Sequence, residues 1–127
     1  MPIRTELALR LPNSPGALAG VCRLLADDRV NLLALSLDTG GQLRLIVDNP
    51  VRAASVLREQ HHQVAERNVL FTTVPNGPGA LAPVLALVAD AAINVEYAYA
   101  SSAEGNRTAA LVLGVDDAAR AAAAAGV

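Results

Sequence analysis

The sequence contains one short motif twice. Residues 12–19 read Pro-Asn-Ser-Pro-Gly-Ala-Leu-Ala, and residues 75–82 read Pro-Asn-Gly-Pro-Gly-Ala-Leu-Ala, 63 positions later. The likeness extends past the motif, because twelve of the twenty positions in 12–31 are identical in 75–94. A fixed period of this length indicates two copies of one supersecondary unit. We therefore expect two domains, residues 1–67 and residues 68–127. Each is so small that its own core is marginal, so we expect the two copies to pack against each other.

The first copy alternates between strand and helix signals. Ser14 suits a helix N-cap, and Pro15 suits the first helical position, where its missing N–H has no partner to lose. The Asn-Pro pair at 49–50 repeats this signal, and the Gly-Gly pair at 40–41 predicts a tight hairpin turn. The elements expected in this copy are strands at 3–11, 32–38, 42–47 and 63–66 and helices at 15–28 and 50–60.

The second copy repeats the order with two changes. Its hairpin is five residues longer, around residues 102–106, and its final strand is expected to be short or absent, because the sequence stops at Val127. The elements expected here are strands at 68–74, 93–100 and 108–115 and helices at 78–92 and 116–125. The order strand–helix–strand–strand–helix–strand predicts an α+β fold of two ferredoxin-like (βαββαβ) units, with helices on one face of an antiparallel sheet.

The side-chain patterns of two predicted strands indicate how the units pack. In residues 32–38, strict alternation points Leu33, Leu35 and Leu37 to one face and Leu32 to the other, so both faces need an apolar cover. Helices supply one cover, and a partner unit or partner chain supplies the other, so we expect self-association. In the second copy, Tyr97 and Tyr99 share a strand face and are expected to fill the core beneath a final helix whose inward residues are all alanine.

Composition argues against several classes of function. The formal net charge is −2, all ten basic residues are arginine, and only three residues are aromatic, so nothing predicts a nucleic-acid surface. The sequence has no run of 18 or more apolar residues, so no membrane helix is predicted. The N-terminal residues lack the apolar core of a signal peptide. A single cysteine, Cys22, cannot form an internal disulfide and fits a reducing, cytoplasmic setting.

We find no set of residues able to catalyse a reaction or hold a metal. His61 and His62 are adjacent, so at a strand start they point to opposite faces and cannot chelate one ion. Cys22 lies in a predicted helix away from both histidines, and no nucleotide-binding or nucleophile motif is present. We therefore expect no catalytic residue, no metal and no cofactor, and hence not an enzyme.

The repeated loop is a better candidate for binding. A helix N-terminus carries unpaired N–H groups that receive anions such as a carboxylate. Gly16 and Gly79 allow close approach to the backbone, and the amides of Asn13 and Asn76 offer both a donor and an acceptor to a zwitterion. Each motif alone is also typical of the residues that start an ordinary helix. Only its recurrence in both copies favours a ligand-binding role.

A second pair of asparagines, Asn31 and Asn94, stands at the far end of each helix. At about 1.5 Å per residue, fifteen residues of helix separate each of them from its own loop. A neighbouring unit related by two-fold symmetry can bring them together. The pattern therefore predicts sites between units, although an asparagine after a helix also suits the left-handed position that ends it.

These motifs resemble the ACT domain, a small amino-acid-sensing regulatory module. The residues that carry the resemblance over 3–127 are Asn13-Ser14-Pro15-Gly16-Ala17-Leu18 with Val30-Asn31-Leu32, Asn76-Gly77-Pro78-Gly79-Ala80-Leu81 with Ile93-Asn94-Val95, and the stretch Glu96–Ala100. The whole chain is similar to a free-standing tandem ACT protein. In ACT modules that bind serine, amides matching Asn13 and Asn31 contact the amino acid. A histidine assists there, where this chain has Leu11 and Val74, so the resemblance implies an amino acid without singling out serine.

The resemblance implies a non-catalytic protein that senses an amino acid at an interface between ACT units, with a homodimer and a metabolic enzyme as expected partners. The alternative is an interaction module or regulatory subunit that binds no small ligand. Position 14 is Ser and position 77 is Gly, the hairpins differ by five residues, and Tyr97 and Tyr99 stand where the first copy has Ala34 and Ser36. Because the two sites have unequal walls, we expect the loop at Asn13 to be the better-occupied site. The expected ligand-binding residues are Asn13, Ser14, Gly16, Ala17, Leu18, Asn31, Leu32, Asn76, Gly77, Gly79, Ala80, Leu81, Asn94 and Val95.

Overall fold

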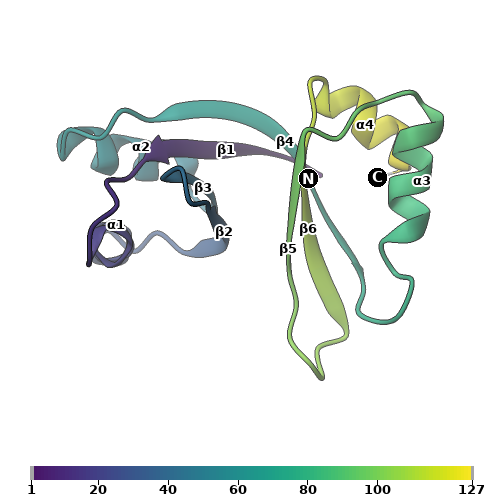
Figure 1. Ribbon diagram of the computed structural model, residues 1–127, viewed down its shortest axis with the longest axis horizontal. Coiled ribbons are helices and arrows are strands. Elements are labelled where there is room, and N and C mark those ends of the chain that lie inside the picture. The colour runs from purple at the N-terminus through teal and green to yellow at the C-terminus, as the bar shows by residue number, and fades with distance from the viewer. Residues whose placement is uncertain (1, 127) are drawn as a thin grey trace. The chain divides into compact units, whose positions relative to one another are not determined.

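The structure is a computed structural model that describes residues 2–126. Its helices and strands confirm the predicted α+β class (Figure 1). They are β1 (Ile3–Arg10), α1 (Ala17–Asp27), β2 (Leu32–Leu37), β3 (Gln42–Val47), α2 (Pro50–Glu59), β4 (Ala65–Pro75), α3 (Ala82–Asp90), β5 (Tyr97–Ser101), β6 (Thr108–Gly114) and α4 (Ala118–Ala125). The predicted strands at 63–66 and 68–74 are one continuous strand, β4, and no strand follows α4 as far as residue 126.

The chain forms two compact units, residues 5–67 and a second that joins residues 68–126 to residues 2–4. The division into domains 1–67 and 68–127 stays a prediction, but in the structure the chain start lies with the second unit. Within the described residues, no helix is both long and apolar enough to cross a membrane.

In the first unit, three antiparallel strands stand in the order β2-β3-β1. Leu7 lies opposite Leu45 and Leu9 opposite Leu43, and these four side chains form the sheet's contribution to a buried core. Helices α1 and α2 complete this core with Val21, Leu25, Ala53, Ala54 and Leu57. The predicted cap of α2 is confirmed, because the Asn49 side chain accepts a hydrogen bond from the Arg52 N–H at 3.1 Å.

The predicted alternation along β2 is wrong at one residue. The pairing of β2 with β3 shifts between Leu32 and Ala34, which leaves Leu33 as a bulge. Beyond the bulge, Leu35 and Leu37 lie opposite the core residues Leu45 and Leu43, and Leu32 packs against the same core. Because an extra residue reverses the face of everything after it, Leu32, Leu35 and Leu37 share one face. Leu35 and Leu37 are each 42 % exposed, at the edge of the sheet.

In the second unit, the strands stand in the order β4-β6-β5, and helices α3 and α4 cover one face of them (Figure 1). Leu70, Leu111 and Leu113 form the centre of this core, and the four buried residues of α4 are all alanine, as predicted. The Asp117 side chain caps α4 by accepting from the Arg120 N–H at 3.0 Å, and α4 ends at left-handed Gly126.

The two tyrosines do not fill the core beneath α4. On β5, the residues opposite Leu113 and Leu111 are Ala98 and Ala100, so short side chains face the helices. Tyr97 and Tyr99 point to the other face, where their rings stack with centroids 6.4 Å apart. The prediction failed because the pairing of β5 with β6 places Ala98 and Ala100, rather than the tyrosines, on the face that the helices cover.

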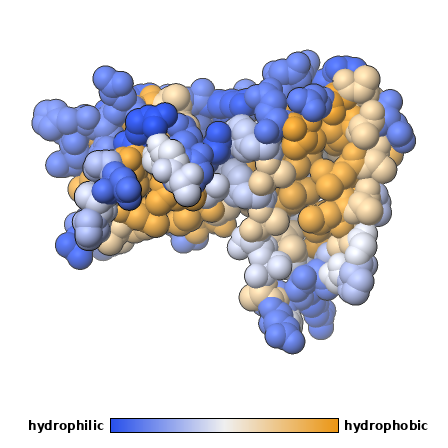
Figure 2. Space-filling view, in the orientation of Figure 1, coloured by the Kyte–Doolittle hydropathy of each residue, from blue (hydrophilic) through white to orange (hydrophobic). Residues whose placement is uncertain are grey.

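Short side chains on β5 also leave the edge of the second core open. Figure 2 shows apolar surface between β5 and α3, next to the alanine-lined strand. Leu81 and Leu87, at the start and on the outer side of α3, are among the exposed large apolar residues. The second unit therefore buries its apolar residues less completely than a core closed by large side chains.

The start of the chain adds to β4. The Phe71 N–H donates to the Pro2 carbonyl oxygen at 2.6 Å, and the Arg4 guanidinium lies 5.0 Å from the centroid of the Phe71 ring. Ile3 packs against the core of the second unit. Residues 2–4 therefore cover the edge of β4 that β6 leaves free, in a unit with no final strand of its own among the described residues.

Replacing Ile3 with alanine should destabilise the second unit. Ile3 is half-buried, so the expected loss is about 1–2 kcal/mol, below the range for fully buried truncations. The measurement is urea unfolding together with amide hydrogen exchange, in which protection should fall at β6 rather than β3.

The control is Val51→Ala, a truncation on the 79 % exposed surface of α2, which should change stability by less than about 0.5 kcal/mol. Equal effects of the two substitutions, or lost protection confined to β3, would contradict a role for the chain start in the second unit.

Candidate functional site

The loop that carries Asn13 enters α1 through a left-handed glycine. Gly16 has φ +84° and ψ −4° and takes the N-cap position, so α1 begins at Ala17 rather than at the predicted Pro15. The predicted N-cap at Ser14 is also wrong, because its side chain makes no cap hydrogen bond and its carbonyl accepts from the Ala17 N–H at 3.3 Å. Only glycine adopts this backbone readily, which accounts for its presence in both copies of the motif.

The β2–β3 hairpin lies against this loop. Asp38 begins the turn, and its side-chain Oδ1 accepts from the Gln42 N–H at 3.0 Å. The Leu11 N–H donates to the Gly41 carbonyl oxygen at 2.8 Å, which ties the end of β1 to the turn. Gly41 has φ +84°, and a Cβ placed there would lie 2.5 Å from the Leu11 carbonyl oxygen. Two independent constraints, backbone conformation and close approach, therefore require glycine at this position.

A pocket of about 240 Å³ lies between the loop and the hairpin. It contains five of the predicted site residues, all from the first copy, together with four hairpin residues that the sequence did not indicate. The lining residues are Leu11, Pro12, Asn13, Ser14, Gly16, Ala17, Leu18, Ala19, Leu37, Asp38, Thr39 and Gly41.

The polar groups of this pocket are of two kinds. The N–H groups of Leu18 and Ala19, in the first turn of α1, have no hydrogen-bond partner among the described residues, since only Ala17 and Gly20 donate back into the loop. The Asn13 side chain likewise has none within residues 2–126. Asp38 is the one charged residue of the lining. A helix N-terminus, an amide and a carboxylate together offer groups for both ends of a zwitterion.

The loop of the second copy is hydrogen-bonded to the hairpin of its own unit. The Asn76 side-chain amide donates to the carbonyl oxygens of Ala103 at 3.0 Å and Asn106 at 2.9 Å. The Asn76 backbone N–H donates to the Arg107 carbonyl oxygen at 2.9 Å. All three acceptors belong to the hairpin that carries the five-residue insertion. The inserted turn therefore accepts hydrogen bonds from the Asn76 amide, whereas the Asn13 amide of the first copy makes no such bond among the described residues.

The helix of the second copy also starts later. Gly79 is left-handed at φ +74°, as Gly16 is, but α3 begins only at Ala82, two positions after the equivalent of Ala17. In the first copy, the Gly20 N–H closes the first turn by donating to the Gly16 carbonyl oxygen at 2.9 Å. Its counterpart, Pro83, has no N–H and cannot make this bond. The motif residues Gly77, Ala80 and Leu81 therefore lie in a turn that precedes the helix.

The remaining predicted residues lie at the other ends of α1 and α3. Asn31 exchanges two hydrogen bonds with Asp48, at 2.9 and 3.0 Å, and is not part of the pocket lining. Arg29 and Ala92, rather than the asparagines, take the left-handed positions that end the helices. Leu32 and Val95 each pack against the core of their own unit, and Asn94 is exposed.

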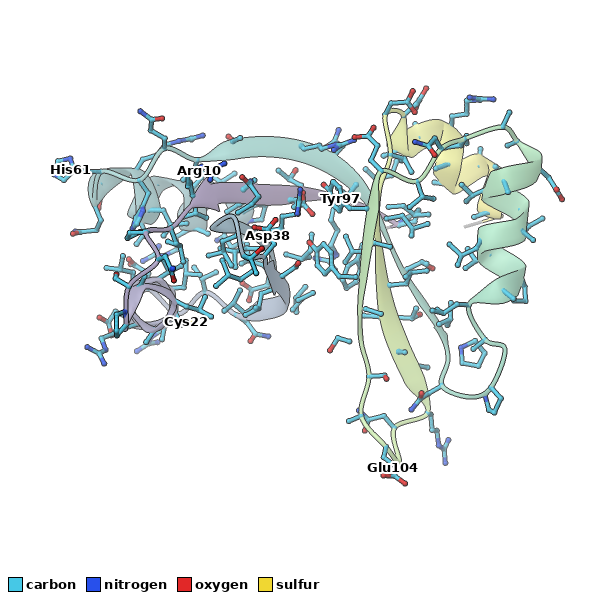
Figure 3. All side chains as sticks on the ribbon, in the orientation of Figure 1. Arg10, Cys22, Asp38, His61, Tyr97 and Glu104 are labelled. Atoms are coloured by element: carbon cyan, nitrogen blue, oxygen red, sulfur yellow. The ribbon has the colours of Figure 1, made fainter. Side chains whose placement is uncertain are left out.

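His61 and Cys22, the residues considered for chemistry, lie on different segments of the first unit. His61 lies in the turn after α2 with φ +70°, instead of at a strand start, and Cys22 is a half-buried free thiol on α1 (Figure 3). Across residues 2–126, no group of three or more His, Cys, Asp or Glu side chains is arranged to hold a metal ion.

Comparisons with known proteins agree with the fold. The family model of the ACT domain pair matches residues 1–125. A solved protein from Bacteroides thetaiotaomicron is 30 % identical, with a TM-score of 0.87, over 97 % of this chain and 86 % of that one. No protein of curated function matches the sequence.

Two structures described as the regulatory subunit of aspartate kinase share the fold at lower identity. The one from Thermus thermophilus, in a ligand-free form, is 18 % identical with a TM-score of 0.72, over 96 % of this chain and 88 % of that one. The one from Thermus flavus is 16 % identical with a TM-score of 0.68, over 99 % and 92 %.

The two glycines near the pocket should respond oppositely to alanine. Gly41→Ala is expected to cost about 1–3 kcal/mol of stability, because its φ is positive and the Leu11 carbonyl blocks the added Cβ. Gly20→Ala, inside α1 with open space around its Cβ, should instead stabilise by about 0.5–1 kcal/mol. Urea unfolding measures both, and a neutral Gly41→Ala would disprove the close approach of the turn to the loop.

Proposed function

Because the chain belongs to the family of ACT domain pairs, we propose that it is a non-catalytic regulatory protein that binds an amino acid at the loop of Asn13. The observation that carries this proposal is the pocket between that loop and the β2–β3 hairpin, whose lining combines open N–H groups with one carboxylate. Two structures of the same fold are regulatory subunits of aspartate kinase, which supports a regulatory role beside a metabolic enzyme.

The first turn of α1 supplies the binding site for the ligand carboxylate. The N–H groups of Leu18 and Ala19 point out of the helix start, where the helix dipole is positive. The Asn13 amide stands before that turn and donates to the same carboxylate, and Gly16 lets the ligand approach the backbone. The Asn31 amide of another unit completes the site in the arrangement predicted from the sequence, and that completion stays a prediction.

One site per chain follows from the difference between the two loops. The Asn76 amide already donates to two carbonyl oxygens of its own hairpin, so a ligand must break those bonds to use it. The Asn13 amide has no such bond among the described residues, and the pocket lies beside it. The loop at Asn13 is therefore proposed as the better-occupied site. Of the differences between the copies that the sequence shows, the longer hairpin supports this more directly than Ser14 does.

A second candidate is an interaction module that acts on an enzyme or on another copy of itself without a small ligand. The observation in its favour is the edge strand β2, where Leu35 and Leu37 are each 42 % exposed. An edge strand with exposed leucines can pair with a partner. The two candidates differ in whether free amino acids change the stability of the isolated chain.

A thermal-shift screen of the twenty amino acids, followed by calorimetry, tests the proposal. At least one amino acid should raise the melting temperature and bind with one site per chain, because a ligand that binds only the folded state stabilises it. If none of the twenty shifts the transition at millimolar concentration, the ligand-free interaction module is the correct reading.

Alanine at the two loop asparagines separates their roles. Asn13→Ala should lower affinity by about 1.5–3 kcal/mol, the value of a hydrogen bond to a charged group, without changing stability. Asn76→Ala should leave affinity unchanged but destabilise by about 1–2 kcal/mol, because two neutral hydrogen bonds to the hairpin are lost. Calorimetry and urea unfolding of both variants check this, and an equal loss of affinity in both would contradict a single site.

A further inference from the structure

We propose that Asp38 is the group that receives the ligand's ammonium, and that the pocket selects α-amino acids with neutral side chains over dicarboxylic ones. This inference rests on the proposed function and adds the ligand class to it. Asp38 lies in the turn between β2 and β3 and lines the pocket opposite the start of α1 (Figure 3). The repeated motif does not contain it, and the family resemblance of the loop does not point to it.

The hairpin holds the Asp38 carboxylate in place. Its Oδ1 accepts from the Gln42 N–H at 3.0 Å, and its backbone N–H donates to the Gln42 carbonyl oxygen at 3.2 Å. The Asp38 carbonyl accepts from the Gly41 N–H at 3.1 Å. Two of these bonds fix the Asp38 backbone and one holds its side chain, so less conformational entropy is lost when an ammonium binds than at an unrestrained aspartate.

The charge of Asp38 is not compensated by an ion pair. Among the described residues Asp38 takes part in no salt bridge, whereas Arg52 and Arg58 are paired with Asp28 and Glu66. Arg10, at the end of β1, donates instead to the Gly40 carbonyl oxygen at 2.5 Å. The second oxygen of the Asp38 carboxylate has no partner within residues 2–126, so it is open to a cationic group of the ligand.

The pocket therefore has one negative and one positive end. The positive end is the first turn of α1, whose open N–H groups suit a carboxylate, and the negative end is Asp38. None of the twelve lining residues is Arg, Lys or His. A second carboxylate on the ligand would find no cationic side chain in the lining and would be repelled by Asp38. Leu11, Leu18 and Leu37 offer contacts to an apolar or small neutral side chain.

The volume agrees with a ligand of this class. A pocket of about 240 Å³ is smaller than the roughly 300–1,000 Å³ typical of drug-sized ligands. The second copy has no counterpart of Asp38, since the residue 63 positions later is Ser101, at the end of β5. The charge at this position thus distinguishes the two copies in the same direction as the hydrogen bonds of Asn76.

The test compares Asp38→Asn with the wild-type chain by isothermal titration calorimetry. Asparagine retains the Oδ1 acceptor for the Gln42 N–H, so the hairpin is preserved while the charge is removed. Asp27→Asn is the matched control, an exposed aspartate at the far end of α1. The probes are L-alanine, L-valine, L-threonine and L-leucine, their N-acetyl forms, L-aspartate and L-glutamate. Equal urea midpoints for the three proteins establish that all are folded.

The expected result is that at least one neutral amino acid binds wild type, and that Asp38→Asn weakens it about 10–100-fold while Asp27→Asn does not. Its N-acetyl form, which has no ammonium, should bind wild type at least tenfold more weakly and be indifferent to Asp38→Asn. Unchanged affinity in Asp38→Asn, or a wild-type preference for aspartate or glutamate, overturns the inference and leaves the proposed function standing.

If none of the twenty amino acids binds wild type, ethanolamine distinguishes the two failures, because it carries the ammonium without the carboxylate. Binding of ethanolamine to wild type and its loss in Asp38→Asn would support the ammonium site and refute the proposed function. No binding of ethanolamine either would overturn both.

Discussion

The geometry of the first unit depends on one backbone hydrogen bond, from the Leu11 N–H to the Gly41 carbonyl oxygen. This bond extends the pairing of β1 with β3 and holds the turn between two strands against the loop that leads into α1, although thirty residues separate them in sequence. It forms only because Gly41 has no side chain and a positive φ. Without it, the hairpin and the helix start would be two ordinary surface features, and the pocket between them would not exist.

The two copies of the repeat show how small sequence changes separate duplicated loops. In the second copy, a proline replaces the glycine whose N–H closes the first helical turn, and five inserted residues place carbonyl oxygens next to Asn76. The amide that is open in one copy becomes part of a hairpin in the other. A repeated sequence therefore does not imply two equal sites, because an amide that is unpaired in one copy makes structural hydrogen bonds in the other.

Local sequence patterns predicted much of the fold, and the predictions failed where the backbone is irregular or where the contact is long-range. The cap at Asn49 and the all-alanine face of α4 follow from neighbouring residues, and the structure confirms them. The bulge at Leu33 reversed the predicted face of the strand that follows it, and the left-handed Gly16 displaced the predicted cap. Five loop residues of the candidate site were predicted, but Asp38 was missed, because only the long-range pairing of β1 with β3 brings the hairpin to the loop.

The way the chain start lies with the second unit has a consequence for dissecting the protein. Strand β1 begins among the residues of the second unit and ends among those of the first, so no single cut yields both units with all their residues. A fragment beginning at residue 68 would expose an edge of β4 and lack Ile3 in its core. Studies of each unit alone would need circularly permuted chains, in which residues 2–4 follow α4 through a short linker, rather than truncations.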